Sequence, residues 1–350
     1  RPSTVFHGAQ PHVAAAPAEE RGLARDGVRL LVARPSEIAY TTFTNLVDYL
    51  QPGDVLVVNT SATVNGEVDA TLGSSEGSRR VVLHVATPLP DGSWVLELRT
   101  FPDAARPVLD ADPGALVESR VGRFQLLEPH GSRSSSPTGA GNRLWRGGPE
   151  DRQDVSALLG AHGRPIAYGY LSARWPLTAY QHVFGTVPGS AEMASAARPF
   201  TPRLVTRLVS RGVAIAPVLL HTGVSSQEAG EPPQPERFRV PRATAAAVNA
   251  LRAMGGRVVA VGTSATRAIE SAVVGGQVVE ADGWTDRVVT PSDPRQVVDG
   301  LLTGWHDALG SHLLLVEAVA GPALTQRAYD EALSNAYDWH EFGDSCLLLP

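Results

Sequence analysis

The residues best suited to chemistry gather around one predicted turn. The run VVAVGTSATRAIES at 258–271 predicts a strand, a tight turn and the start of a helix. Free backbone N–H groups at such a helix start bind anions or polar ligands. The hydroxyls of Thr263 and Ser264 would add contacts, and Arg267 would clamp a carboxylate through two hydrogen bonds. An ordinary turn with helix-capping residues is the alternative interpretation.

Two histidines are candidates for proton transfer. His221 ends the apolar run IAPVLLH, and the carboxyl end of a strand in an α/β domain faces the usual ligand cleft. We expect His221 to be a general base, with a structural, hydrogen-bonded histidine as the alternative. His306 in LLTGWHD is the second candidate, as acid or base. No histidine pair has HExxH or HxH spacing and Cys346 is the single cysteine, so we expect no metal.

The elements that must position these residues alternate between strands and helices in the second half of the chain. Thr201-Pro202 predicts a helix start and Gly212 its end. The patterns predict strands at 28–33, 54–59, 213–221, 257–261 and 346–349, and helices at 43–50, 201–211, 243–254, 265–274 and 322–337. This alternation indicates an α/β body.

The pattern of apolar residues changes in the segment 64–127. Short apolar runs alternate with turn signals, and Asp91-Gly92 between two runs is typical of a hairpin. Several short strands at this spacing predict a small β-barrel or sandwich. The stretch 129–151 is rich in Gly, Ser and Pro, so we expect a loop there.

Composition excludes several function classes. The 350 residues carry a net charge of −6, which argues against a general nucleic-acid binder. All 30 basic residues are arginine, so a Walker-type lysine and a Schiff-base lysine are excluded. No apolar stretch is long enough for a membrane span, and residues 1–28 lack a secretory apolar segment. We expect a cytoplasmic protein with no membrane partner.

Several segments together resemble one family. The sequence is similar to the S-adenosylmethionine:tRNA ribosyltransferase-isomerases of queuosine biosynthesis. The resemblance runs collinearly from Arg29 to Leu349, and its strongest matches are QPGDVLVVN (51–59), AYQHVFG (179–185), PFTPRLVTRLVSRGVAIAPVLLHTG (199–223), GGRVVAVGTSATRAIES (255–271), GWTD (283–286), VVDGLLT (297–303) and FGD (342–344). It implies an α/β (α+β) main domain, 1–63 and 151–350, with an inserted β-barrel domain at 64–150.

The resemblance also implies an unusual reaction. S-adenosylmethionine, the co-substrate, would give up its ribose carbons after losing a proton beside the sulfonium, with no metal. The ribose portion would pass to the aminomethyl group of 7-aminomethyl-7-deazaguanine in tRNA and rearrange to an epoxycyclopentanediol, releasing adenine and methionine. Such chemistry needs a base, an acid and a water-poor pocket. The implied catalytic residues are His221, His306 and Glu192, and the implied substrate-binding residues are Thr263, Ser264, Arg267, Asn59, Tyr180 and Gln181.

Some polar positions depart from the family pattern. The family's Asn-Asp-Thr-Arg reads Asn59-Thr60-Ser61-Ala62 here, and a family histidine is replaced by Pro199. Losing one polar partner in a buried site weakens binding by roughly 1–3 kcal/mol. Two alternatives therefore stay open. One is an enzyme that uses S-adenosylmethionine on a small-molecule acceptor or cleaves it without tRNA, and the other is a non-catalytic binding protein on the same fold.

Overall fold

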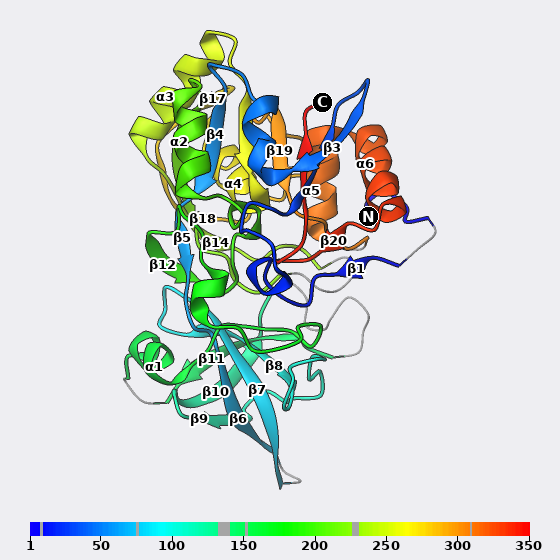
Figure 1. Cartoon of the computed structure of the whole chain (residues 1–350). Coiled ribbons are helices and arrows are strands. Elements are labelled where there is room, and N and C mark those ends of the chain that lie inside the picture. Colours follow the sequence, from blue (N-terminus) through cyan, green and yellow to red (C-terminus); the bar gives the residue numbers. More distant parts are fainter. Residues whose placement is uncertain (8–9, 75–76, 132–140, 151–152, 226–230, 309) are drawn as a thin grey trace.

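A computed structural model describes residues 1–7, 10–74, 77–131, 141–150, 153–225, 231–308 and 310–350. Its body is a nine-stranded mixed sheet (Figure 1). The strand order is β18 (Ala281–Thr285), β14 (Glu236–Val240), β13 (Ala214–Leu220), β4 (Val55–Asn59), β15 (Val258–Val261), β19 (Gly300–Thr303), β21 (Ser345–Leu348), β2 (Arg29–Ala33) and β3 (Ile38–Thr42). The four neighbours β13, β4, β15 and β19 are parallel, so their carboxyl ends meet at one edge.

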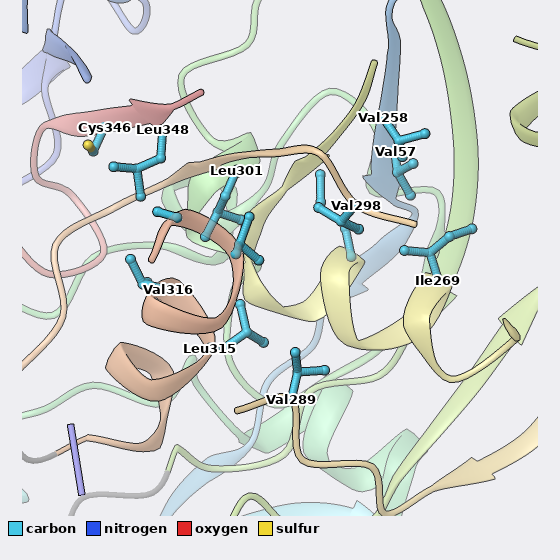
Figure 2. Packing of buried hydrophobic residues seen from close by; sticks show 14 of the residues in the cluster. Val57, Val258, Ile269, Val289, Val298, Leu301, Leu315, Val316, Cys346 and Leu348 are labelled. Carbon is cyan, nitrogen blue, oxygen red and sulfur yellow. The ribbon is translucent and has the colours of Figure 1, made fainter. Parts of the chain in front are cut away.

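Both faces of the sheet are buried at its central strands, which explains the continuous apolar runs in β4, β15 and β19. In β4, Val55 and Val57 point into one core, whereas Leu56 and Val58 point into the other. The first core is covered by α3 (Arg242–Ala253), α4 (Gly262–Glu270), α5 (Ser311–Ala320) and α6 (Pro322–Ser334), and the second by the 3₁₀ helices η2 (Phe43–Tyr49) and η4 (Ser195–Ala197) and by α2 (Pro202–Ser210). Figure 2 shows Val57, Val258 and Ile269 packing together in the first core.

The second sheet is a closed six-stranded antiparallel barrel at the lower end of Figure 1. Its strands are β6 (Glu67–Ser74), β7 (Gly77–Pro88), β8 (Trp94–Thr100), β9 (Leu116–Ser119), β10 (Gly122–Pro129) and β11 (Leu144–Pro149). Helix α1 (Val155–His162) packs on the barrel core through Val155 and Leu159. The predicted combination of an α/β body and a small β-barrel is confirmed. The domain division at 63/64 and 150/151 stays a prediction.

The chain enters and leaves the barrel through neighbouring segments. Strands β5 (Ser61–Thr63) and β12 (Val187–Ser190) pair in parallel beside the sheet. Further on, Glu67 forms an isolated bridge with Arg164, whose backbone N–H donates to the Glu67 carbonyl at 2.9 Å. The remaining short elements are η1 (Glu19–Arg21), η3 (Leu177–Tyr180), the pair β1 (His12–Val13) and β20 (Asp338–Trp339), and the hairpin β16 (Val273–Val274) and β17 (Gln277–Val278).

The structure corrects two predicted boundaries. The helix predicted at 265–274 ends at Glu270, because Val273-Val274 folds into a two-residue strand that turns back at Gly275-Gly276. Within the loop predicted at 129–151, the strand β11 closes the barrel against β8 and β10, while 132–140 and 151 lie outside the described residues. Within the described ranges, no helix combines the length and apolar character that crossing a bilayer requires.

Candidate active site

A cavity of about 610 Å³ lies at the carboxyl edge of the parallel strands. It is lined by residues at or just after the carboxyl ends of three of them: 222–225 near the end of β13, 262–264 after β15, and 303–307 at the end of β19. Open α/β sheets bind ligands at this edge, and the volume is typical of small-molecule pockets. The cavity is therefore the candidate active site.

The facing wall comes from other parts of the chain. The barrel strand β8 contributes Arg99, and the segment 168–170 after the barrel contributes two tyrosines. Glu192 follows β12, and His340 and Glu341 precede the last strand of the sheet. The cavity thus lies between the sheet edge and the barrel, and neither unit encloses it alone.

The start of α4 forms part of the sheet-side wall, as the strand-turn-helix pattern predicts. Gly262 has φ +88°, and a Cβ there would lie 3.2 Å from the Cβ of Ala196. Thr263 and Ser264 both line the cavity. The Ser264 hydroxyl accepts a hydrogen bond from Asn59 Nδ2 at 3.2 Å, so the helix start is fixed to the end of β4.

Arg267 lines the cavity, but its guanidinium N–H groups already donate hydrogen bonds to other residues of the protein. Its Nη1 lies 2.6 Å from Glu236 Oε2, its Nε donates to the Arg287 carbonyl at 2.8 Å, and its Nη2 donates to the Thr285 carbonyl at 3.1 Å. The predicted carboxylate clamp is therefore an internal ion pair that holds α4 against the strands β14 and β18.

Glu192 and Glu341 line the cavity together with the ion-paired Glu236, and the surroundings of these two carboxyl groups differ. Glu192 accepts hydrogen bonds from the Tyr168 hydroxyl and from the hydroxyl and N–H of Ser225, the last at 3.2 Å. Glu341 accepts one hydrogen bond, from the Tyr170 hydroxyl at 3.3 Å. Burial and the charge of Glu192 raise the pKa of Glu341 to about 8. Glu192 thus accepts hydrogen bonds from three donors, whereas Glu341 accepts one and keeps its proton near neutral pH.

Rings form much of the remaining lining. Tyr170 stacks between Tyr168, at 6.2 Å, and His340, at 4.7 Å between ring centroids. His306 stacks on His312 at 5.0 Å, and its Nε2 lies 2.8 Å from the Thr303 hydroxyl. Burial, with the neighbouring histidines, lowers the pKa of His306 well below its ordinary value. His306 is therefore neutral at physiological pH.

Four of the predicted site residues are absent from the described cavity lining. Asn59 bonds Leu220, Ser61 and Ser264, and so holds β4 to its neighbours. His221 Nδ1 lies 2.7 Å from the Ser61 hydroxyl, and its ring packs over Gly189. Tyr180 is buried against Phe342 with ring centroids 5.2 Å apart, and Gln181 bonds both backbone groups of Thr63. These contacts give all four residues positions in the scaffold next to the cavity, and their part in the site stays a prediction.

Sequence reasoning missed Glu341, His312, Tyr170 and Arg287 as lining residues. The signal for Glu341 was its place directly before the family-like FGD at 342–344. In the described part of the chain, no three His, Cys, Asp or Glu side chains are arranged to hold a metal ion.

Comparisons with known proteins agree over nearly the whole chain. The family model described as "Queuosine biosynthesis protein" matches residues 5–348. The S-adenosylmethionine:tRNA ribosyltransferase-isomerase of Acaryochloris marina is 31% identical over 93% of this chain and 88% of its own length. The enzyme of that name from Anaeromyxobacter dehalogenans is 33% identical, over 93% of each chain.

The fold agrees as well. The crystal structure of the S-adenosylmethionine tRNA ribosyltransferase from Thermotoga maritima superposes with a TM-score of 0.53 at 26% identity, covering 98% of this chain and 99% of that one. The names of these relatives support neither a small-molecule acceptor nor a non-catalytic role. The chain belongs to the queuosine-biosynthesis family of S-adenosylmethionine:tRNA ribosyltransferase-isomerases.

Proposed function

We propose that this protein transfers and isomerises the ribosyl portion of S-adenosylmethionine onto 7-aminomethyl-7-deazaguanine in tRNA, in the cytoplasm, releasing adenine and methionine. The observation that carries the proposal is the similarity to enzymes of this name over more than nine-tenths of the chain. The cavity supports it, because it lies at the ligand-binding edge of the sheet and holds the carboxyl groups of Glu192 and Glu341 in contrasting environments.

The lining has the chemistry that S-adenosylmethionine requires. When bound, this co-substrate supplies a positively charged sulfonium whose neighbouring carbon loses a proton. Glu192 and the ring of Tyr170, which line one wall, would stabilise a positive charge. The N-terminal turn of α4, with the Thr263 and Ser264 hydroxyls, would hold polar groups of the co-substrate on the sheet side.

The two glutamates provide an acid and a base. The hydrogen-bond partners of the two carboxyl groups distinguish the two roles. Glu192, with three donors on its carboxylate, would accept a proton. Glu341, with its pKa raised to about 8, would give a proton to the departing adenine. His306 stays in the proposal as a neutral proton acceptor on the same cavity, and the role of His221 as a base stays a prediction.

The test is product release. The purified protein is incubated with S-adenosylmethionine, with and without tRNA that carries the deazaguanine base, and adenine and methionine are followed by mass spectrometry. Release that depends on the tRNA supports the proposal. Equal release without tRNA, or none from folded protein with both substrates, overturns it.

Two variants connect the activity to the cavity. Glu192→Gln removes the carboxylate of the proposed base and is expected to lower turnover by about 10²–10⁴-fold. Glu118→Gln is the matched control, because that carboxylate is exposed on the barrel and pairs with Arg123 at 2.6 Å. It should leave turnover unchanged.

A further inference from the structure

Among the described residues, three arginines line the cavity, and they differ in how their donors are used. Arg99 donates to the Ala104 carbonyl at 2.6 Å, to Glu97 Oε1 at 2.8 Å and to the Ala105 carbonyl at 3.1 Å. Arg267 is committed to Glu236 and to two carbonyls at 2.6–3.1 Å. Both guanidinium groups are therefore neutralised or satisfied by the protein itself.

Arg287 is different. Within the described residues, its side chain has no hydrogen bond shorter than 3.4 Å: Nη2 lies 3.5 Å from Asp293 Oδ1 and 3.4 Å from the Pro294 carbonyl. Good N–H···O bonds measure 2.7–3.2 Å. Its Nε is buried without any partner in the described structure. The guanidinium thus keeps donors that an incoming anion would satisfy.

The backbone of Arg287, by contrast, is fixed. Its N–H donates to the Thr285 hydroxyl at 3.1 Å, and its carbonyl accepts from Arg267 Nε at 2.8 Å. These two hydrogen bonds hold the backbone of Arg287 at a defined position on the cavity wall. Its guanidinium group, in contrast, can bind a ligand. The Asp293 side chain is 63% exposed, so water screens the ion pair between Arg287 and Asp293.

Charges on this wall are ordered from cationic to acidic. Arg287 contacts Arg267, Arg267 contacts Glu236, and Glu236 Oε1 accepts from the Gly223 N–H at 2.9 Å. Two residues further on, Ser225 donates to Glu192. The Arg267–Glu236 ion pair in between is internally balanced. The positive charge of Arg287 is paired only with the exposed Asp293 at 3.5 Å, and the carboxylate of Glu192 lies at the other end of this series.

We propose that Arg287 binds the carboxylate of the methionine portion of S-adenosylmethionine, and so selects this co-substrate over a decarboxylated one. The inference rests on the proposed function, and it names the recognition element of that same site. Arginine suits the task, because its planar fork matches a carboxylate bidentately and its charge does not depend on pH.

The experiment measures binding by titration calorimetry, independently of turnover. S-adenosylmethionine and S-adenosyl-3-methylthiopropylamine, which lacks only the carboxylate, are titrated into wild type, Arg287→Ala and Arg287→Lys. Arg239→Ala is the matched control, because Arg239 is 56% exposed on β14 and pairs only loosely with Asp282 at 3.8 Å.

Wild type should bind S-adenosylmethionine more tightly than the analogue. Arg287→Ala should weaken S-adenosylmethionine by roughly 10- to 150-fold, the range for a hydrogen-bonded charge, and the analogue by less than about 3-fold. Arg287→Lys should retain part of the discrimination, because it keeps the charge but loses the fork. Arg239→Ala should match wild type.

The inference is overturned if Arg287→Ala binds S-adenosylmethionine like wild type, or if it weakens both ligands equally while folding normally. In either case wild type still binds, and the proposed function stands. Absence of S-adenosylmethionine binding to folded wild type is a separate result, which overturns the proposed function and this inference together.

Discussion

Glu341 makes the stability of the protein depend on pH in a way that one substitution isolates. Its pKa is raised from 4.5 to about 8 by burial and by the charge of Glu192. A carboxyl group with a raised pKa stabilises the folded state fully below its unfolded pKa. That contribution is lost as the pH rises from about 4.5 to about 8.

The magnitude follows from the shift. At 1.36 kcal/mol per unit, moving from 4.5 to about 8 corresponds to about 5 kcal/mol if the site is fully shielded. Glu341 keeps some exposed surface, and solvent screens its interactions. We therefore expect a loss of about 2–3 kcal/mol between pH 5 and pH 9 that belongs to this residue.

The assay is urea unfolding of wild type and Glu341→Gln at unit steps from pH 5 to pH 9. Glutamine resembles the protonated acid and cannot ionise, so the variant should lose less stability than wild type as the pH rises. Glu118→Gln controls for removing a carboxylate at an exposed site. Glu192→Gln should reduce the pH dependence, since it removes the charge that helps to hold the proton on Glu341.

Parallel curves for wild type and Glu341→Gln over this range would refute the reasoning. They would mean that Glu341 ionises with an ordinary pKa, and the role of Glu341 as proton donor would fall with it.

Three further predictions concern the scaffold. Gly189→Ala should lower the free energy of unfolding by about 1–3 kcal/mol, because φ is +154° and the new Cβ would lie 2.5 Å from His221 Cε1; a urea titration measures it. His84→Ala should lower the free energy of unfolding by about 3–5 kcal/mol, because the buried His84 ring lies 3.0 Å from both Glu67 and Glu97. Thermal unfolding measures this, and an unchanged midpoint would contradict the prediction. Thr201→Ala should cost about 1 kcal/mol in the same assay, since Thr201 caps α2 through the Leu204 N–H at 3.2 Å, whereas Thr206→Ala on the exposed face should cost less.

The sequence was most informative where one short segment determines its own structure. Thr201 and Gly212 mark the ends of α2 by local capping and backbone conformation, and the turn into α4 was placed because Gly262 interrupts an apolar run. The α/β body followed from the same local patterns, which predicted a barrel or a sandwich for 64–127, and the family resemblance implied the barrel.

The site was predicted only in part, because its properties depend on residues far apart in the chain. His221 looked like a free base, but its partner Ser61 lies 160 positions away. Arg267 looked like a ligand clamp, and only the folded chain brings Glu236 to it. The raised pKa of Glu341 depends on its burial in the fold and on the charge of Glu192, which no spacing rule connects to it.

The closure at Glu67 and Arg164 has an evolutionary consequence. The Gly66 N–H donates to the Arg164 carbonyl at 3.0 Å, and the Arg164 N–H donates to the Glu67 carbonyl at 2.9 Å, so the barrel begins and ends at one point in space. The segment from Glu67 to Arg164 can therefore be regarded as one long loop of the main body, with its two ends held together by backbone hydrogen bonds. A gene could therefore gain, lose or exchange this segment in one recombination event without changing the register of any strand in the nine-stranded sheet.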